Sequence, residues 1–165
     1  MDINHLPAGS RCLVDANILI YHLDELSLDC KAFLERVARR EVEAHLTTII
    51  VAEVLHRQML TEAVSKGAVT AGQPLKKLKA NPHLISGLFD YISKVEKLLK
   101  LPLQINQVTE ADISASHALR RTRGLFVNDS INLACAERLG ITEIVTHDSD
   151  FTRVSTITVW QPTDV

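Results

Sequence analysis

The segment 125–151 constrains the fold more than any other part of the chain, because it reads as a helix and then a strand, with acids beside both. Apolar residues recur at helical spacing after Asn128 and Asp129, either of which can cap the helix start, and Gly140 can end it. Residues 141–146 are β-branched and bounded by polar residues, which is typical of a strand. The segment therefore predicts a helix packed on a sheet, followed by the next strand.

The geometry of such a unit brings its acids together. In a right-handed helix-then-strand unit, the helix runs back from the edge where the preceding strand ended, and the next strand returns to that edge. Asp129 at the helix start and Asp148 just after the strand should therefore meet. Neighbouring carboxylates repel and raise each other's pKa unless a positive charge lies between them. We infer a divalent cation at this position.

Composition limits the classes of protein to which the chain can belong. Its 165 residues, 46% of them apolar, are enough for one compact domain spanning residues 1–165. The net charge of -2 does not suit a broad basic face, so any contact with a polynucleotide must be local or metal-mediated. The three cysteines form no CxxC pair and no apolar run matches a membrane span. We expect a cytoplasmic protein with reduced cysteines and no membrane contact.

The order of the predicted elements favours an α/β fold. Strands are predicted at residues 11–14, 43–46, 103–105, 141–146 and 157–160, the last of them at a sheet edge. Helical patterns separate most of these strands, which indicates a central, mostly parallel sheet of four to five strands covered on both faces. A helix is also predicted over residues 83–100. Gly, Pro and Lys residues interrupt the pattern at 58–82, where we expect a helical or loop insertion with a solvated lysine cluster.

Two further acids are predicted to lie at the same edge of the sheet. Asp15 follows the first strand directly, and Glu53 lies about one turn into the helix after the second strand. Ligands bind at this edge in open α/β sheets. Asn17 can cap the helix after Asp15 or orient Asp15 by a hydrogen bond. An all-oxygen cluster suits Mg²⁺ or Mn²⁺, which activate water and stabilise the leaving oxygen in phosphodiester hydrolysis.

The residues around these acids resemble a known family. The chain is similar to the PIN-domain ribonucleases, and most similar to the VapC-type toxins of type II toxin-antitoxin systems. Four pieces carry the resemblance: LVDANILIYHL around Asp15, TTIIVAEVLHR around Glu53, LFVNDSINLACAERLG around Asp129 and IVTHDSDF around Asp148. Each piece alone is a weak signal, but together they span most of the chain in the family's order.

The resemblance implies a PIN-like three-layer α/β/α fold and a metal-dependent endoribonuclease. It implies a catalytic set, called here the acidic quartet, made of Asp15, Glu53, Asp129 and Asp148. It also implies Asp150 as an auxiliary metal ligand, with Asn17, Ser130 and Thr146 as polar support. A homodimer and an inhibitory antitoxin are the partners it implies, besides the RNA substrate.

Three arginines just before the acidic segment have two interpretations. Arg120, Arg121 and Arg123 end a predicted helix, where cations interact favourably with the helix dipole. The same arginines precede Asp129 by a few residues and can contact RNA phosphates. The sequence leaves both interpretations open.

Other functions fit the sequence less well. The pair Glu53 and His56 is reminiscent of di-iron bundles, but no second such pair exists. A haloacid-dehalogenase-like phosphatase needs an acid where Asn17 stands, and a dinucleotide-binding domain needs GxGxxG where the chain reads DANILI. Two readings stay open: a PIN-like module that binds protein or RNA without catalysis, and a nuclease acting on DNA.

Overall fold

The computed structural model describes residues 1–165 and has a central sheet of five parallel strands. The strands lie in the order β3-β2-β1-β4-β5, and every neighbouring pair is parallel. They are β1 (Arg11–Val14), β2 (Glu43–Thr47), β3 (Gln104–Asn106), β4 (Glu143–Val145) and β5 (Thr158–Trp160). The predicted three-layer α/β/α fold is confirmed. The sheet is wholly parallel, and β5 lies at an edge as predicted.

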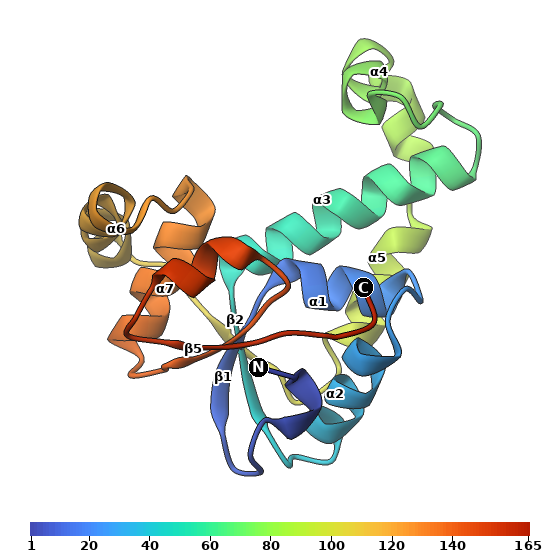
Figure 1. Cartoon of the computed structure of the whole chain (residues 1–165). Coiled ribbons are helices and arrows are strands. Elements are labelled where there is room, and N and C mark those ends of the chain that lie inside the picture. Colours follow the sequence, from blue (N-terminus) through green and yellow to red (C-terminus); the bar gives the residue numbers. More distant parts are fainter.

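Helices cover both faces of this sheet (Figure 1). The helices are α1 (Ala16–Leu23), α2 (Leu28–Ala38), α3 (Thr48–Ser65), α4 (Pro74–Ala80), α5 (Asp90–Leu98), α6 (Glu110–Arg123) and α7 (Val127–Arg138). Three 3-10 helices are η1 (Ile3–His5), η2 (Pro82–Gly87) and η3 (Ser149–Arg153). Right-handed crossovers explain the layers, since the chain steps outward from β1 to β3 on one face and returns to β4 through α6 and α7 on the other.

The direction of these connections changes between β1 and β4. The chain leaves β1 toward β2, whereas it leaves β4 toward β5 on the opposite side. Val14 pairs with Val145, so the residues that follow them, Asp15 and Thr146, lie level with each other at the carboxyl end of the sheet. A ligand crevice is expected at such a switch point in parallel α/β sheets.

One large hydrophobic core holds this sheet and its helices together. It contains 29 buried residues, and the β1 residues Cys12, Leu13 and Val14 are buried on both faces of the sheet. Such continuous burial is characteristic of parallel strands covered on both sides. All three cysteines are free and buried, in agreement with a packing role. None of the helices combines the length and the apolar character that crossing a membrane requires.

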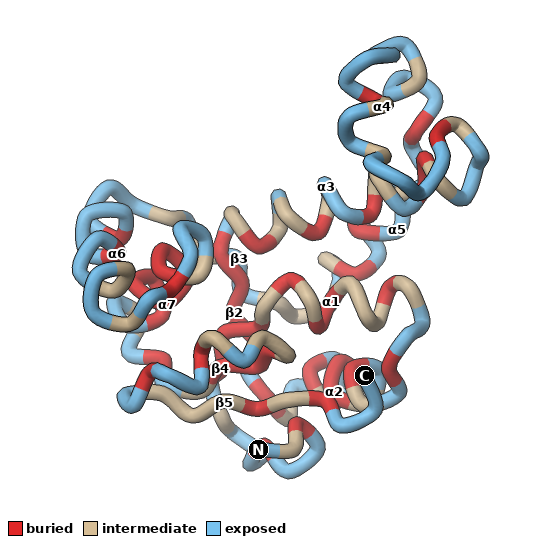
Figure 2. Tube along the Cα trace, turned by 45° about the horizontal axis from the view of Figure 1, so that its top comes forward, coloured by how far each residue is buried: buried red, intermediate tan, exposed pale blue.

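A second, smaller cluster supports a projection that we call the arm, residues 59–91 (Figures 1 and 2). Its buried apolar residues are Ala63, Val69, Leu78 and Leu88. The irregular segment predicted from residue 58 begins later, because α3 continues to Ser65. We call the rest of the chain the body.

The helix predicted over residues 83–100 is divided into η2 and α5. The reason is a buried carboxylate on α3. Glu62 accepts backbone hydrogen bonds from Phe89 (3.1 Å) and Tyr91 (2.7 Å), so those N–H groups do not continue a helix from the preceding turn. A contact between distant residues therefore sets the start of α5.

Candidate active site

Asp15 lies at the centre of a hydrogen-bond network at the carboxyl end of β1. Its Oδ1 accepts from the Ala16 N–H (2.7 Å), which makes Asp15 the N-cap of α1. Its Oδ2 accepts from the Asn17 amide (2.7 Å) and the Thr146 hydroxyl (2.6 Å). Of the two roles considered for Asn17, the structure supports orientation of Asp15. The network fixes one rotamer of the Asp15 carboxylate.

The Thr146 hydroxyl uses its full hydrogen-bonding capacity in this network. It donates to Asp15 and accepts from the Asn17 amide (3.1 Å) and the Asp148 N–H (2.9 Å). A hydroxyl has one donor and two acceptor positions, so none is left unpaired. Asn17 also accepts from the His147 N–H (3.2 Å). The end of β4 and the start of α1 are thereby held together through side chains.

Asp129 lies in the first turn of α7 and faces the other acids. The N-cap of α7 is Phe126, so the prediction that Asn128 or Asp129 caps this helix is wrong. Gly140 ends the helix as predicted, since it adopts a left-handed backbone with φ of 67° just after the C-cap. Asp129 is the third residue of α7, where a carboxylate is stabilised by the positive end of the helix dipole.

The acids affect one another electrostatically. Burial raises the pKa of Asp15 to about 6, against the opposing hydrogen bonds from Thr146 and Ala16, and the charges of Glu53 and Asp148 raise it further. Burial also raises the pKa of Asp129 to about 6, assisted by the charges of the other three quartet members and of Asp150. The four carboxylates that the sequence placed at one edge therefore share one electrostatic site.

Glu53 is positioned by a buried contact that the sequence analysis missed. The Thr47 hydroxyl caps the start of α3, the helix of Glu53, by accepting from the Ile50 N–H (3.2 Å). The same hydroxyl donates to the Asn132 carboxamide on α7 (2.6 Å). Asn132 thus ties the helix of Glu53 to the helix of Asp129. A polar residue within the apolar run of α7 was the available signal.

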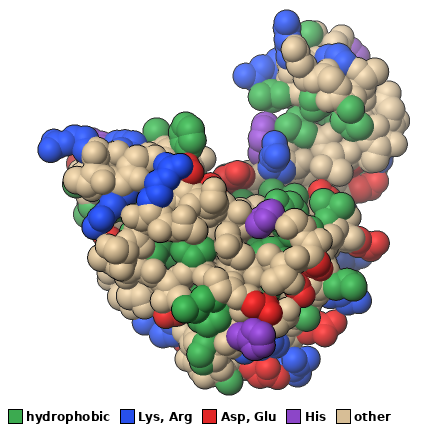
Figure 3. All heavy atoms as spheres, in the orientation of Figure 1, with side chains coloured by type: hydrophobic (Ala, Val, Ile, Leu, Met, Phe, Trp, Pro, Cys, Tyr) green, Lys and Arg blue, Asp and Glu red, His purple; other side chains and the backbone are tan.

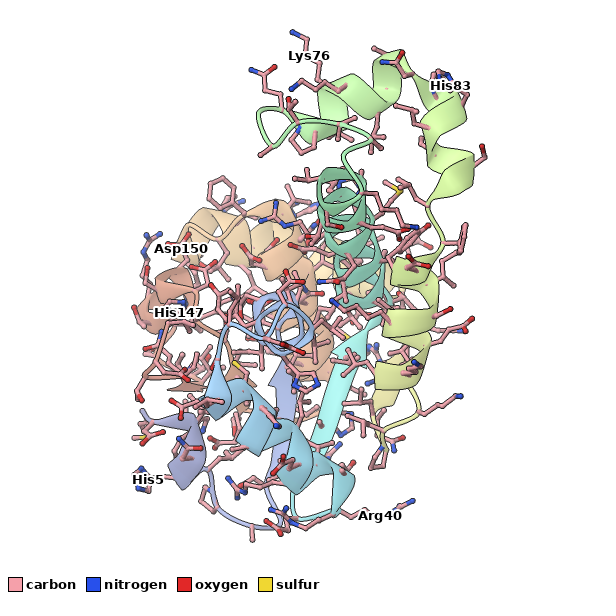
Figure 4. The ribbon with its side chains drawn as sticks, turned by 90° about the vertical axis from the view of Figure 1, so that its right-hand side faces the viewer. His5, Arg40, Lys76, His83, His147 and Asp150 are labelled. Atoms are coloured by element: carbon pink, nitrogen blue, oxygen red, sulfur yellow. The ribbon has the colours of Figure 1, made fainter.

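Asp148 and Asp150 have different surroundings; Figure 4 labels Asp150 and the nearby residue His147. Asp148 caps η3 by accepting from the Asp150 N–H (2.8 Å). Asp150 forms an ion pair with Arg153 (2.7 Å), which neutralises part of its charge. His147 lies between Thr146 and Asp148 in the chain, and its Nδ1 is 3.2 Å from the Tyr21 hydroxyl. Asp148 is therefore the freer carboxylate of the pair.

The three arginines at the end of α6 are not equivalent. Arg120 is half-buried, and its Nη1 donates to the hydroxyls of Ser116 (2.9 Å) and Ser130 (3.1 Å). Ser130 is thus bonded to Arg120, with no hydrogen bond to the acids. Arg121 is exposed and Arg123 is half-exposed. In Figure 3, acidic side chains lie at the base of the hollow between α6 and the arm, and Lys and Arg side chains gather on the α6 side.

The donor set of this site fits a hard divalent cation. Carboxylate oxygens are the ligands that Mg²⁺ and Mn²⁺ prefer, and a cation would relieve the mutual repulsion that adds to the effect of burial on the two pKa values. As placed, no three His, Cys, Asp or Glu side chains are arranged so that they could hold an ion. Binding by these residues therefore requires side-chain rotation or bridging water, since Mg²⁺ usually keeps several waters.

The fold and the site define a class: a parallel α/β protein with an acidic site at the switch point of its sheet. The family model of the PIN domain matches residues 12–157. The chain belongs to the PIN domain family, and the resemblance seen in the sequence is confirmed. No curated protein matches the chain at a significant level.

Solved structures with the same fold include toxins of VapBC pairs. VapBC2 from Rickettsia felis, bound to a DNA fragment from its promoter, is 18% identical over 92% of this chain and 98% of that chain, with a TM-score of 0.61. VapBC-1 from nontypeable Haemophilus influenzae is 17% identical over 92% and 97%, with a TM-score of 0.58. The sarcin-ricin loop cleaving toxin VapC20 of Mycobacterium tuberculosis is 12% identical over 87% and 95%, with a TM-score of 0.55.

Proposed function

We propose that this PIN-domain protein is an Mg²⁺- or Mn²⁺-dependent endoribonuclease and the toxin of a toxin-antitoxin pair. The observation that carries the proposal is the convergence of the acidic quartet, where burial and then the neighbouring carboxylates raise the pKa values of Asp15 and Asp129 to about 6. Membership of the PIN family supports nuclease chemistry. The neighbour described as a sarcin-ricin loop cleaving toxin supports RNA as the substrate.

The chain's own residues have separable roles in this proposal. The acidic quartet would hold the cation, and Asp150 would assist only after leaving Arg153. When bound, a divalent cation supplies an activated water and charge stabilisation at the scissile phosphate. Asn17 and Thr146 hold Asp15 in one rotamer, and Thr146 also fixes the backbone at Asp148. Arg120 presents positive charge beside α7 for a phosphate, supported by Ser116 and Ser130.

Cleavage assays with single-stranded RNA test the chemistry. We expect cleavage only with Mg²⁺ or Mn²⁺, and its loss in the Asp15→Asn and Asp129→Asn variants. Because binding to the folded state stabilises a protein, Mg²⁺ should also raise the Tm of the wild type but not of Asp129→Asn. Undiminished cleavage in excess EDTA would refute the metal requirement, and full activity of both variants would refute the site.

Thr146→Val tests whether positioning matters separately from ligation. This variant keeps the shape of the side chain but removes the donor to Asp15 and the acceptor for Asp148. Loss of a residue that orients a metal ligand typically lowers metal affinity or activity about 10- to 100-fold. We expect a decrease in that range that higher Mg²⁺ partly restores, and Thr146→Ser should retain activity. An active Thr146→Val at low Mg²⁺ would contradict the role.

Two protein partners belong to the same proposal. Neighbours that are toxin-antitoxin complexes support an antitoxin. An open groove of about 410 Å³ between α1 and the arm, lined in part by Ile20, Leu60 and Val64, offers an apolar surface for it. Ile105 on edge strand β3 and Ile113 on α6 are exposed apolar side chains that a second copy would cover. Co-expression with the adjacent reading frame and light scattering of the pure chain test the antitoxin and the homodimer.

A non-catalytic PIN-like binding module is the second candidate function. The observation that favours it is the spacing of the acids, no three of which are arranged to hold an ion. The two candidates differ in one measurement. A binding module binds RNA or protein equally well in wild type and Asp129→Asn and shows no cleavage with either metal, whereas a nuclease loses cleavage in the variant.

A further inference from the structure

The chain exposes two phenylalanine rings, and the structure explains only one of them. Phe89 in the arm is 59% exposed, but the Lys66 ammonium lies 4.6 Å from its ring centroid. The Phe89 N–H is also bonded to buried Glu62. Phe126 in the body is 75% exposed and has no aromatic or cation–π partner within the chain. Packing therefore accounts for Phe89 but not for Phe126.

Phe126 also occupies a position where another residue would stabilise the helix better. It is the N-cap of α7, and it provides no side-chain hydrogen bond to the first turn. Ser, Thr, Asp or Asn at an N-cap typically contributes about 1 kcal/mol relative to a residue that cannot cap. With the exposed Phe126 at this position, the start of α7 is therefore less stable than it would be with a capping residue.

The positions of Phe126 and Asp129 in α7 can be compared with the equivalent positions in the neighbouring helix, α6. Phe126 and Asp129 are the N-cap and third residue of α7. In α6 the equivalent pair is Thr109 and Asp112, whose side chains meet at 2.9 Å in a capping box. The two positions therefore project to the same side of a helix start, which places Phe126 beside the acidic site.

Two arginine side chains lie near residues that flank Phe126 in the chain. The Phe126 carbonyl accepts from the Ser130 N–H (2.9 Å), and the Ser130 hydroxyl holds Arg120. Arg153 Nη1 lies close to Gly124, two residues before Phe126, and the same side chain pairs with Asp150. An exposed ring with arginines near the same helix start matches one unpaired nucleobase with its flanking phosphates, because bases stack on aromatic rings and phosphates attract arginines.

We propose that Phe126 is a nucleobase-stacking site that binds an unpaired base of the RNA beside the phosphate to be cut. This inference rests on the proposed ribonuclease function and adds the form of the substrate. The bound strand must be unstacked at this nucleotide, so loops and single strands are favoured over duplexes. Base identity matters through stacking strength, so purines bind better than pyrimidines.

Binding of short single-stranded RNA tests the site without cleavage. Fluorescence anisotropy in the Asp15→Asn background compares Phe126→Ala and Phe126→Trp with the parent, and Leu28→Ala, which removes another exposed apolar side chain on α2, is the matched control. Base stacking on an aromatic side chain predicts affinity about tenfold weaker for Phe126→Ala. Affinity should be retained in Phe126→Trp and Leu28→Ala.

An abasic scan locates the base. A set of oligonucleotides, each with one abasic position, should contain one position that weakens binding to the parent but not to Phe126→Ala, because removing either partner of one contact removes the same interaction. Equal affinity of Phe126→Ala and parent for the intact RNA would overturn the stacking site. So would an abasic penalty that is the same in both proteins at every position.

The outcomes separate this inference from the proposed function. Metal-dependent RNA cleavage that Phe126→Ala leaves unchanged, together with unchanged RNA affinity, would overturn the stacking site and leave the nuclease intact. Phe126→Ala that loses a protein partner but not RNA would assign the ring to a protein interface and overturn the inference. A wild-type chain that neither binds nor cleaves RNA would overturn both.

Discussion

The body and the arm are stabilised in different ways. The body buries 29 residues in one core around a five-stranded sheet, whereas the arm has four buried apolar residues and no strand. The arm instead depends on Glu62, which is buried yet bonded to two backbone N–H groups and paired with Lys66 at 2.6 Å. We infer that the body folds cooperatively through apolar burial, whereas the arm is a region of lower local stability.

The largest effect should come from matched core truncations. Leu46 in β2 and Leu78 in α4 are both almost fully buried, but in the large and the small cluster respectively. Leu46→Ala should lower the free energy of unfolding by about 2–5 kcal/mol, as for other large-to-small core changes. Leu78→Ala should mainly open the arm, leaving the body's urea midpoint nearly unchanged.

Urea denaturation with hydrogen exchange tests this contrast. Arm amides should exchange faster in Leu78→Ala while amides of β1 and β4 stay protected, because local opening has its own free energy. An equal loss of global stability in the two variants would show that arm and body are one cooperative unit.

Acid should weaken the body through one buried ion pair. Arg138 hydrogen-bonds the Asp112 carboxylate (2.7 Å) and lowers the pKa of Asp112 to about 2, against the effect of burial. The folded pKa lies below the unfolded value, so this stabilisation is present above about pH 4 and is lost as pH falls toward 2. It amounts to about 2 kcal/mol.

Unfolding measured between pH 6 and pH 2 checks the Asp112 prediction. Asp112→Asn should be less stable at pH 6, and its stability should fall less steeply with acid than that of the wild type. An unchanged slope in Asp112→Asn would contradict it.

In the arm, Glu62→Gln should produce a smaller and local change. Glutamine keeps one carbonyl acceptor but loses the second acceptor and the charge that pairs with Lys66. We expect about 1 kcal/mol less protection at the amides of Phe89 and Tyr91, measured by hydrogen exchange. Faster exchange in β-strand amides of the body would refute the local character of this contact.

The smallest effect should come from the arm's lysines. Lys76 and Lys79 are exposed on α4, and their sequence pattern indicated a solvated face. Replacing both by alanine should change RNA cleavage less than about twofold, whereas Arg120→Ala should weaken RNA binding and reduce its salt dependence. A larger effect of the lysines than of Arg120 would place the RNA contact on the arm.

The same contrast explains how far the sequence could predict the structure. The strand positions and the presence of a helix after Asp15 followed from apolar runs and strand-end polar residues, because each element of the body buries an apolar face that is visible in its sequence. The break before α5 depends on Glu62, more than 25 residues earlier in the chain, and α3's length depends on the small arm cluster. Local sequence patterns cannot reveal such contacts, because the residues involved are far apart in the chain.

Some features of the acidic site could likewise be predicted from the sequence, and others could not. Placement of the acids at one edge followed from strand ends and right-handed crossovers. The roles of Asn132 and Phe126 did not, since one is a buried polar contact between two helices and the other replaces a conventional cap. Ser130 was expected to support the acids, whereas its hydroxyl accepts a hydrogen bond from Arg120.

The pairing of β1 with β4 has a consequence for synthesis of the protein. Asp15 is held by Thr146, 131 residues later in the chain, so the hydrogen-bond network around Asp15 cannot form on a partly translated polypeptide. Contacts of such sequence separation also slow folding, since a long loop must close first. A ribosome-bound nascent chain therefore has an incomplete acidic site until Thr146 has left the exit tunnel. Any partner that recognises only the finished fold can therefore bind no earlier than the moment at which the acidic site is completed.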